Sequence, residues 1–287
     1  MRVLVTGGTG YIGGAVLRAL RAAGHEPRGV VRSEEAARGV RARGGVPVNG
    51  DLRDPRGLAE LARDADAVIH AASTQSPDAA EADIAASRAI RDALEGSGKP
   101  FVLTSGAWVL GDTGDRMADE TWPRNPVELV AWRGPLEEEI LAAPGMRGIV
   151  LRPGVVFGEH GGIPESVAQG ELPVVGDGAQ HWALVHVRDL ADLYVRALGA
   201  PAGAILHGIA LVATMRDVAL LGAARRGGRS FESATLAQAR DRLGAFADAL
   251  AINQRISSDR TQALLNWRPS RTSLVEEFLG DGRLAAA

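Results

Sequence analysis

The chain has 287 residues, 46% of them hydrophobic, and a formal net charge of −3 at pH 7. This composition is typical of a globular protein and gives no indication of a nucleic acid or an anionic membrane as partner. The absence of cysteine excludes disulfides, thiolate metal sites and cysteine nucleophiles. Because no apolar run reaches membrane-spanning length and a strand-like segment starts at residue 2, we expect a cytoplasmic protein without a signal peptide.

The opening residues combine a strand, a glycine-rich turn and a helix. Residues 3–5 are β-formers, Gly8, Gly10 and Gly13 supply a G-x-G-x-x-G pattern, and a helical pattern then runs to Gly24. A helix reached through glycines presents free backbone N–H groups and the positive end of its dipole to a pyrophosphate. We therefore predict that this segment binds a dinucleotide, the alternative being a tight strand–helix turn with no ligand.

Strands and helices alternate over the next 140 or so residues. Ser33 and Asp54 are predicted helix N-caps, and the loop over 111–125 is long enough to be functional. The predicted strands are 26–32, 45–49, 66–70, 101–104 and 148–152, and the predicted helices include 55–63, 79–95 and 126–141. This alternation predicts an α/β fold with a doubly wound parallel sheet, the Rossmann fold, and ligands bind such sheets beyond the carboxyl ends of the strands.

After residue 154 the alternation weakens. A strand-like segment at 183–187 precedes a helix at 189–198, and the remaining residues are mostly helical in pattern. We predict a dinucleotide-binding Rossmann domain over 1–155, with parts of 180–210, and a smaller, mostly helical substrate-binding lobe over 156–287.

The end of the second predicted strand bears on the choice of cofactor. Dinucleotide folds that bind NAD place an acidic residue there, which hydrogen-bonds the ribose 2′-hydroxyl. Here Arg32 and Ser33 stand at that position, and both suit a 2′-phosphate. We expect NADP(H) rather than NAD(H); the alternative is that Arg32 is a solvated cation and that Glu34 or Glu35 reaches the ribose.

Six motifs in order resemble the extended short-chain dehydrogenases/reductases of the NAD-dependent epimerase/dehydratase type. They are Thr6-Gly7-Gly8-Thr9-Gly10-Tyr11-Ile12-Gly13, Gly50-Asp51-Leu52, His70-Ala71-Ala72, Thr104-Ser105-Gly106, Leu151-Arg152-Pro153-Gly154-Val155-Val156-Phe157-Gly158, and Val185-His186-Val187-Arg188-Asp189-Leu190-Ala191, with Asn266-Trp267-Arg268-Pro269 similar to the family's closing motif. The resemblance implies an adenine contact at Asp51 and a nicotinamide border at residues 152–155. It also implies pairing of two copies through the helices at 79–95 and 126–141. The cofactor-binding residues that we expect are Gly7, Gly10, Tyr11, Ile12, Gly13, Arg32, Ser33, Asp51, Leu52, Ala71, Ala72, Ser73, Thr104, Arg133, Pro153 and Val155.

The chain departs from this family at its catalytic pair, a Tyr-x-x-x-Lys. Its two tyrosines, Tyr11 and Tyr194, are each without a lysine four residues later, and Lys99 is its one lysine. Alignment with the family places Leu129 at the tyrosine position and Arg133 at the lysine position. An arginine keeps the positive charge but, with a pKa above about 12, does not act as a base.

Other residues must then supply the chemistry. Ser105 is a candidate for polarising a substrate carbonyl, and Arg133 for contacting cofactor or substrate. His160, in a glycine-rich loop, and His181 are candidate proton donors, although each could equally be a structural residue. Four tryptophans near the expected cleft, at 108, 122, 132 and 182, favour an apolar or aromatic substrate or, alternatively, core packing. No cluster of His, Asp and Glu has metal-ligand spacing.

Three functional hypotheses remain at this point. The first is an NADP(H)-dependent oxidoreductase that acts on a small, largely apolar carbonyl, imine or enone compound. The second is a redox-neutral epimerase, dehydratase, isomerase or cyclase of the same fold. The third is a non-catalytic NADP(H) sensor that has lost the Tyr/Lys pair.

Overall fold

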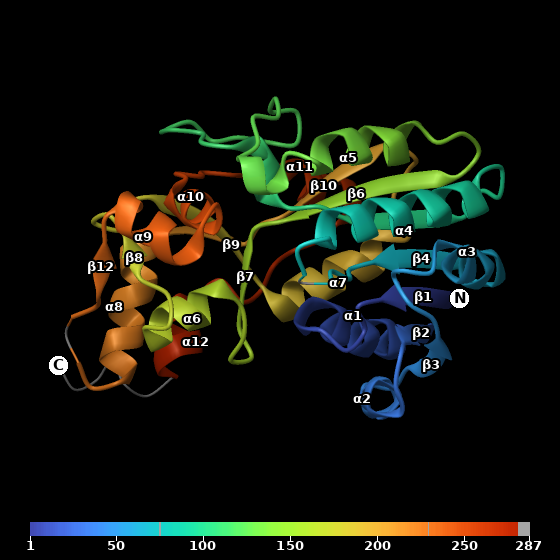
Figure 1. The fold of residues 1–287 in the computed structure, drawn as a ribbon, viewed down its shortest axis with the longest axis horizontal. Helices are drawn as coiled ribbons and strands as arrows, with labels where there is room; N and C mark the ends of the chain where they lie inside the picture. The colour runs from blue at the N-terminus through green and yellow to red at the C-terminus, as the bar shows by residue number, and fades with distance from the viewer. Residues whose placement is uncertain (75, 229, 281–287) are drawn as a thin grey trace.

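In the computed structural model, which describes residues 1–74, 76–228 and 230–280, a parallel sheet with helices on both faces adjoins a smaller lobe (Figure 1). The sheet has seven strands, and every pair of neighbours is parallel. In spatial order they are β10 (Ala204–Gly208), β6 (Arg147–Pro153), β5 (Pro100–Thr104), β4 (Ala67–His70), β1 (Arg2–Thr6), β2 (Glu26–Val31) and β3 (Val46–Asn49). The predicted doubly wound α/β fold is therefore confirmed, and β10 is a strand that the sequence pattern did not predict.

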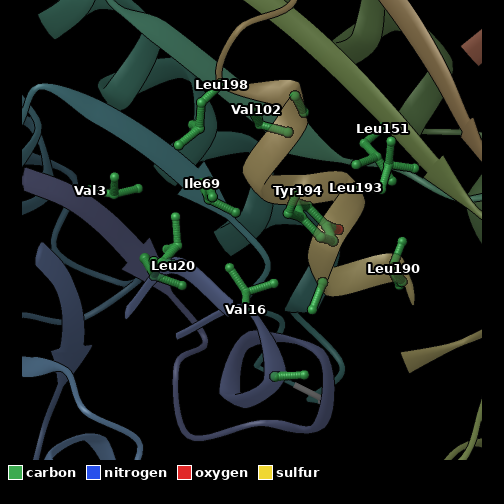
Figure 2. Packing of buried hydrophobic residues seen from close by; sticks show 14 of the residues in the cluster. Val3, Val16, Leu20, Ile69, Val102, Leu151, Leu190, Leu193, Tyr194 and Leu198 are labelled. Atoms are coloured by element: carbon green, nitrogen blue, oxygen red, sulfur yellow. The ribbon is translucent and has the colours of Figure 1, made fainter. Parts of the chain in front are cut away.

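Two layers of helices bury the two faces of the sheet. One face packs against α1 (Tyr11–Ala22), α2 (Glu34–Ala42) and α7 (Val187–Ala197), and the other against α3 (Pro55–Asp64), α4 (Ala79–Leu94) and α5 (Arg133–Ala142). Figure 2 shows the first interface, in which Leu193 and Tyr194 of α7 belong to one core cluster with Ile69 and Leu151 of the strands. Because both faces are covered, the inner strands β1, β4, β5 and β6 consist mostly of apolar residues.

The helix ends follow the predicted chemistry at two positions. The side chains of Ser33 and Asp54 accept hydrogen bonds from the backbone N–H groups of Ala36 and Gly57, at 3.2 and 3.1 Å, and so cap α2 and α3. Gly24 follows the end of α1 with a φ of +79°, a conformation that glycine adopts without strain.

The prediction of one helix over 126–141 is wrong in its first half. A short 3₁₀ turn covers Glu128–Val130, and α5 begins only at Arg133. Pro135 explains this boundary, because proline lacks an N–H and its ring would clash with the carbonyl of residue 131 if an α-helix continued upstream. Leu129 and Arg133 consequently do not share a helix.

The second lobe has its own core, formed by residues of several short elements. Its helices are α6 (Ile163–Gln169), α8 (Met215–Arg225), α9 (Leu236–Leu243), α10 (Phe246–Ala251) and α12 (Leu274–Leu279), while α11 (Asp259–Leu265) packs on β10. Its strands are β7 (Val155–Phe157), β9 (His181–His186) and β11 (Leu211–Thr214) in one small sheet, and β8 (Val174–Val175) and β12 (Ser233–Ala234) in another. Residues 281–287, which we predicted as part of this lobe, lie outside the described residues.

The segment that follows β5 leaves the sheet and returns to it. It starts with a 3₁₀ turn over Ala107–Leu110 and then runs alongside residues 253–257, to which its backbone is hydrogen-bonded. It comes back through the turn at Glu128–Val130. The two turns therefore lie side by side at the carboxyl end of the sheet, where ligands bind in this architecture. Throughout the described ranges, no helix combines the length and the apolar character that crossing a membrane requires.

Candidate active site

The glycine turn after β1 is as tight as the sequence suggested. A Cβ atom at Gly13 would lie 2.2 Å from the carbonyl oxygen of Gly7, and Gly7 itself has a φ of +74°. Helix α1 begins at Tyr11 with Gly10 as N-cap, without a side-chain hydrogen bond to its first turn and without an acidic residue in that turn. The first N–H groups of this twelve-residue helix therefore have no side-chain cap, an arrangement that suits a diphosphate.

The residues predicted to contact the adenosine half of the cofactor follow the next two strands. Arg32 follows β2, and its guanidinium lies 3.9 Å from the carboxylate of Asp51, which follows β3. The side chain of Arg32 is largely exposed and that of Asp51 is partly exposed, so both are open to a ligand. Ser33 stands beside Arg32, although its oxygen already accepts the α2 capping bond. Leu52 packs against the core below α3.

The end of β4 closes the glycine turn from the other side. The backbone N–H of Ala71 donates to Thr6 Oγ1 at 3.2 Å, and a Cβ at Gly7 would lie 2.6 Å from the carbonyl oxygen of Ala71. This close packing places Ala71 and Ala72 along the turn. The buried ring of His70 supports Thr6 through a 2.8 Å contact from Nδ1 to Oγ1.

A cavity of about 620 Å³ continues from the glycine turn into the space between the sheet and the second lobe. Its size is that of an ordinary small-molecule site. The lining is mostly apolar, and the side chain of Arg133 is its one charged group among the described residues. It is lined by Tyr11, Ile12, Ser73, Ser76, Pro77, Ala79, Ala80, Thr104, Ser105, Gly106, Ala107, Trp108, Leu129, Val130, Trp132, Arg133, Pro153, Gly154, Val155, Val156, Gly162 and Ile163.

Ser105 has a buried hydroxyl that faces no protein partner. The residue is 7% exposed, it lines the cavity, and its Oγ makes no hydrogen bond to any described residue. Its backbone is fixed by a 2.8 Å hydrogen bond from its N–H to the carbonyl oxygen of Leu151 on β6. A buried hydroxyl without a partner costs free energy, and a ligand oxygen in the cavity would recover that cost.

Arg133 enters the same cavity from the first residue of α5. Its Nη1 donates to the carbonyl oxygen of Thr104 at 2.9 Å, and its guanidinium lies 4.4 Å from the ring centroid of Trp132. Desolvation lowers the pKa of Arg133, while the charges of Asp83 and Glu137 oppose that shift. The group stays a cation, because an arginine retains its proton under all ordinary conditions.

The two tyrosines are both engaged in structural contacts. Tyr11 donates its hydroxyl hydrogen to the carbonyl oxygen of Gly158 at 2.6 Å, which ties the glycine turn to the second lobe. The hydroxyl of Tyr194 lies 2.7 Å from Thr104 Oγ1, and the residue is completely buried. Burial raises the pKa of Tyr11 and of Tyr194 far above the ordinary value, so both are poor proton donors.

The structure does not bring the two candidate histidines to the cavity. His160 is exposed on the loop between Gly158 and Gly162, with a φ of 57°. His181 is held by two neighbours, through contacts of 3.1 Å from Nδ1 to Asn253 and of 3.1 Å from Nε2 to Arg255. Neither residue is part of the lining. His186 instead accepts the backbone hydrogen bond of Arg188 and caps α7.

Eight of the predicted site residues line this cavity. The cavity lining contains Tyr11, Ile12, Ser73, Thr104, Ser105, Arg133, Pro153 and Val155. Of the four tryptophans, Trp108 and Trp132 line the cavity, Trp182 is core, and Trp122 stacks under Arg116 outside it. Sequence reasoning missed Ser76, Pro77, Ala79, Ala80 and Ile163, although the position of the first four, after the carboxyl end of β4, was a usable signal.

The comparisons with known proteins agree with this geometry. A family model described as "NAD dependent epimerase/dehydratase family" matches residues 3–209. A Schizosaccharomyces pombe protein described as "Uncharacterized protein C2A9.02" is 32% identical over 98% of this chain and 99% of its own length. An NAD(P)H azoreductase from Xenophilus azovorans is 29% identical over 69% of this chain and 64% of its own.

A solved structure of the human epimerase family protein SDR39U1 (isoform 2) with NADPH superposes with a TM-score of 0.75 and 25% identity, over 97% of each chain. The chain belongs to the NAD dependent epimerase/dehydratase family. It is an NAD(P)-dependent oxidoreductase of the short-chain dehydrogenase/reductase type.

Proposed function

We propose that this protein is an NADP(H)-dependent reductase of a small, largely apolar carbonyl, imine or enone compound. The observation that carries the proposal is the unpartnered, buried hydroxyl of Ser105 on the wall of a mostly apolar cavity. A hydroxyl in that position suits a hydrogen bond to the oxygen or nitrogen of a substrate double bond.

The residues around the glycine turn fit the cofactor. The N–H groups at the start of α1 would hold the diphosphate, Arg32 the 2′-phosphate and Asp51 the adenine. When bound, the reduced nicotinamide supplies the hydride. The part played by the chain's own residues is to orient the substrate with Ser105 and Arg133 and to exclude water with the apolar wall.

The apolar wall supports the substrate class. Trp108 and Trp132 line the cavity together with Leu129, Val130 and Ile163. A nucleotide-linked sugar would need cations for its diphosphate, and Arg133 is the one cation on the described lining. This wall therefore supports an uncharged or weakly polar substrate.

The test is NADPH consumption with a panel of carbonyl, imine and enone compounds. We expect turnover with apolar members of the panel and a fall of about 10- to 1,000-fold in kcat/KM on Ser105→Ala, since a lost hydrogen bond to developing charge has that order of effect. Ser233→Ala, on an exposed strand, is the control. Activity unchanged by Ser105→Ala would contradict the role of the serine, and turnover without net NADPH consumption would favour the redox-neutral hypothesis instead.

A further inference from the structure

The cavity contains a cation that has no carboxylate partner. Arg133 is half-buried, and no described carboxylate oxygen lies within 4.0 Å of its guanidinium. The neighbouring Glu137 pairs instead with Arg152 at 3.0 and 2.5 Å. A partly desolvated charge without a counter-ion favours an anionic ligand.

This cation is hydrogen-bonded to the peptide group that joins Thr104 to Ser105. The carbonyl oxygen that receives the Arg133 hydrogen bond at 2.9 Å belongs to Thr104, whose peptide bond ends at the Ser105 nitrogen. That hydrogen bond uses one of the five N–H donors of the guanidinium. The guanidinium of Arg133 and the free hydroxyl of Ser105 thus adjoin one peptide group, and both residues line the cavity.

The described lining offers no good proton donor beside these two groups. It contains no His, Asp or Glu side chain, and its tyrosine, Tyr11, already donates to Gly158. Serine and arginine can stabilise a negative oxygen by hydrogen bonding, but neither gives up its proton readily. Such a site suits a product that leaves as an anion.

We infer that Ser105 and Arg133 form an oxyanion site for delocalised organic anions, so that the favoured substrates are quinone-type or strongly conjugated acceptors. This inference deepens the proposed function and rests on it. When such an acceptor takes a hydride from NADPH at a conjugated carbon, a new C–H bond forms there, the carbon–carbon π pair shifts toward the carbonyl carbon, and the carbonyl π pair moves onto oxygen as an enolate. In a quinone ring this enolate becomes a phenolate by tautomerisation, and the nicotinamide is left oxidised. Solvent then supplies the proton that completes the two-electron reduction. An isolated ketone would give an alkoxide about as basic as hydroxide, for which this cavity has no acid.

Binding of a chromophoric phenol tests the site without any turnover. The probe is 4-nitrophenol, whose anion absorbs visible light, and the protein is loaded with NADP⁺, which cannot reduce it. Titration of the bound probe should give a pKa lower than that of the free phenol by about one unit or more, which corresponds to about tenfold tighter binding of the anion. Ser105→Ala and Arg133→Met should each remove most of this shift, whereas Arg133→Lys should retain part of it.

Arg116→Met is the matched control, because the guanidinium of Arg116 also lies 4.4 Å from a tryptophan ring centroid but outside the cavity. It should leave the shift unchanged. A bound phenol with an unchanged or raised pKa, a shift that survives both variants, or no binding of the phenol would overturn the inference. The proposed function fails separately, if NADPH does not bind or no member of the carbonyl panel is reduced. Rapid reduction of isolated ketones but not of conjugated acceptors would support the proposed reductase function and contradict the oxyanion site.

Discussion

The hydroxyl groups of Tyr194 and Thr104 lie 2.7 Å apart, one on α7 and the other at the end of β5. Tyr194 is buried among the apolar residues of this face of the sheet (Figure 2). Through its contact with Thr104 it supports the end of β5, directly before Ser105. Tyr194 therefore has a positioning role, while the cavity itself contains no phenol that is free to move a proton.

Tyr194→Phe should reduce the free energy of unfolding by about 1 kcal/mol, which is the usual worth of one hydrogen bond. We expect NADPH binding and the pH profile of activity to stay close to those of the parent, because no proton passes through this phenol. Chemical denaturation and a kcat/KM profile over pH are the measurements. Loss of one ionisation from that profile would show that Tyr194 takes part in proton transfer.

Gly13→Val should abolish cofactor binding while leaving a folded protein, provided that the turn opens to accept the side chain. A Cβ at this position meets the Gly7 carbonyl oxygen at 2.2 Å, so the turn cannot keep its present form. NADPH fluorescence titration measures the effect, and circular dichroism monitors the fold. Gly96→Ala is a suitable control, because a Cβ there meets nothing within 4 Å, although its φ of +70° will cost some stability. Parent-like NADPH affinity in Gly13→Val would contradict the assigned role of the turn.

Arg32→Ala should weaken NADPH binding by about 10-fold or more and leave NADH binding nearly unchanged. The physical reason is the loss of a charge-assisted hydrogen bond to the 2′-phosphate, which NADH lacks. Equilibrium titration with both nucleotides gives the two dissociation constants, and Arg56→Ala, an exposed arginine on α3, is the control. Equal losses for both nucleotides would mean that Arg32 contacts a part of the cofactor that they share.

Glu137→Gln should cost about 3–5 kcal/mol of folding free energy, because it leaves the buried guanidinium of Arg152 without its counter-charge. Arg152 is 2% exposed and Glu137 is fully buried, with hydrogen bonds of 3.0 and 2.5 Å between them. The double variant Glu137→Leu with Arg152→Met should recover most of the loss, since no uncompensated charge then remains. A loss that is as large in the double variant as in the single one would contradict this explanation.

The free energy of unfolding should decrease, and the protein become less stable, as the pH drops from about 7.5 to 5. Burial lowers the pKa of His207 below its ordinary value, so the unfolded chain binds a proton at a higher pH than the folded one does. The stability from the neutral ring is therefore complete above the unfolded pKa of about 6.5 and is lost below it. Denaturation at several pH values measures the slope. His207→Asn should reduce the slope of the unfolding free energy against pH by the equivalent of up to one bound proton. The slope that remains should come from His186 and His25, whose pKa values are also lowered.

The alternating pattern predicted the sheet, its caps and the glycine turn because these features depend on short stretches of sequence. Ser33 and Asp54 cap their helices through bonds to residues three positions away. The missed strand β10 depends on a distant partner, since His207 pairs in register with Arg152. A short strand of that kind has no local signal that separates it from a loop.

Site residues at the ends of strands could be predicted from the sequence. Site residues whose position depends on contacts with distant side chains could not. Ser105 and Arg133 line one cavity. The end of the fifth strand had indicated the serine, and alignment with the family had indicated the arginine. His181 precedes a predicted strand and was therefore expected near the cavity, but its ring contacts Asn253 and Arg255 instead. These contacts are between residues far apart in the chain, so the local sequence does not predict them. Leu129 was expected one helical turn from Arg133, and Pro135 prevents that arrangement.

Equilibrium titration of the purified protein with NADPH and with NADH tests the central claim most directly, namely that the glycine turn and Arg32 bind a phosphorylated dinucleotide. The account predicts saturable binding of NADPH, at least about tenfold tighter than that of NADH, and its loss in Gly13→Val. Absence of NADPH binding, or tighter binding of NADH, would contradict it.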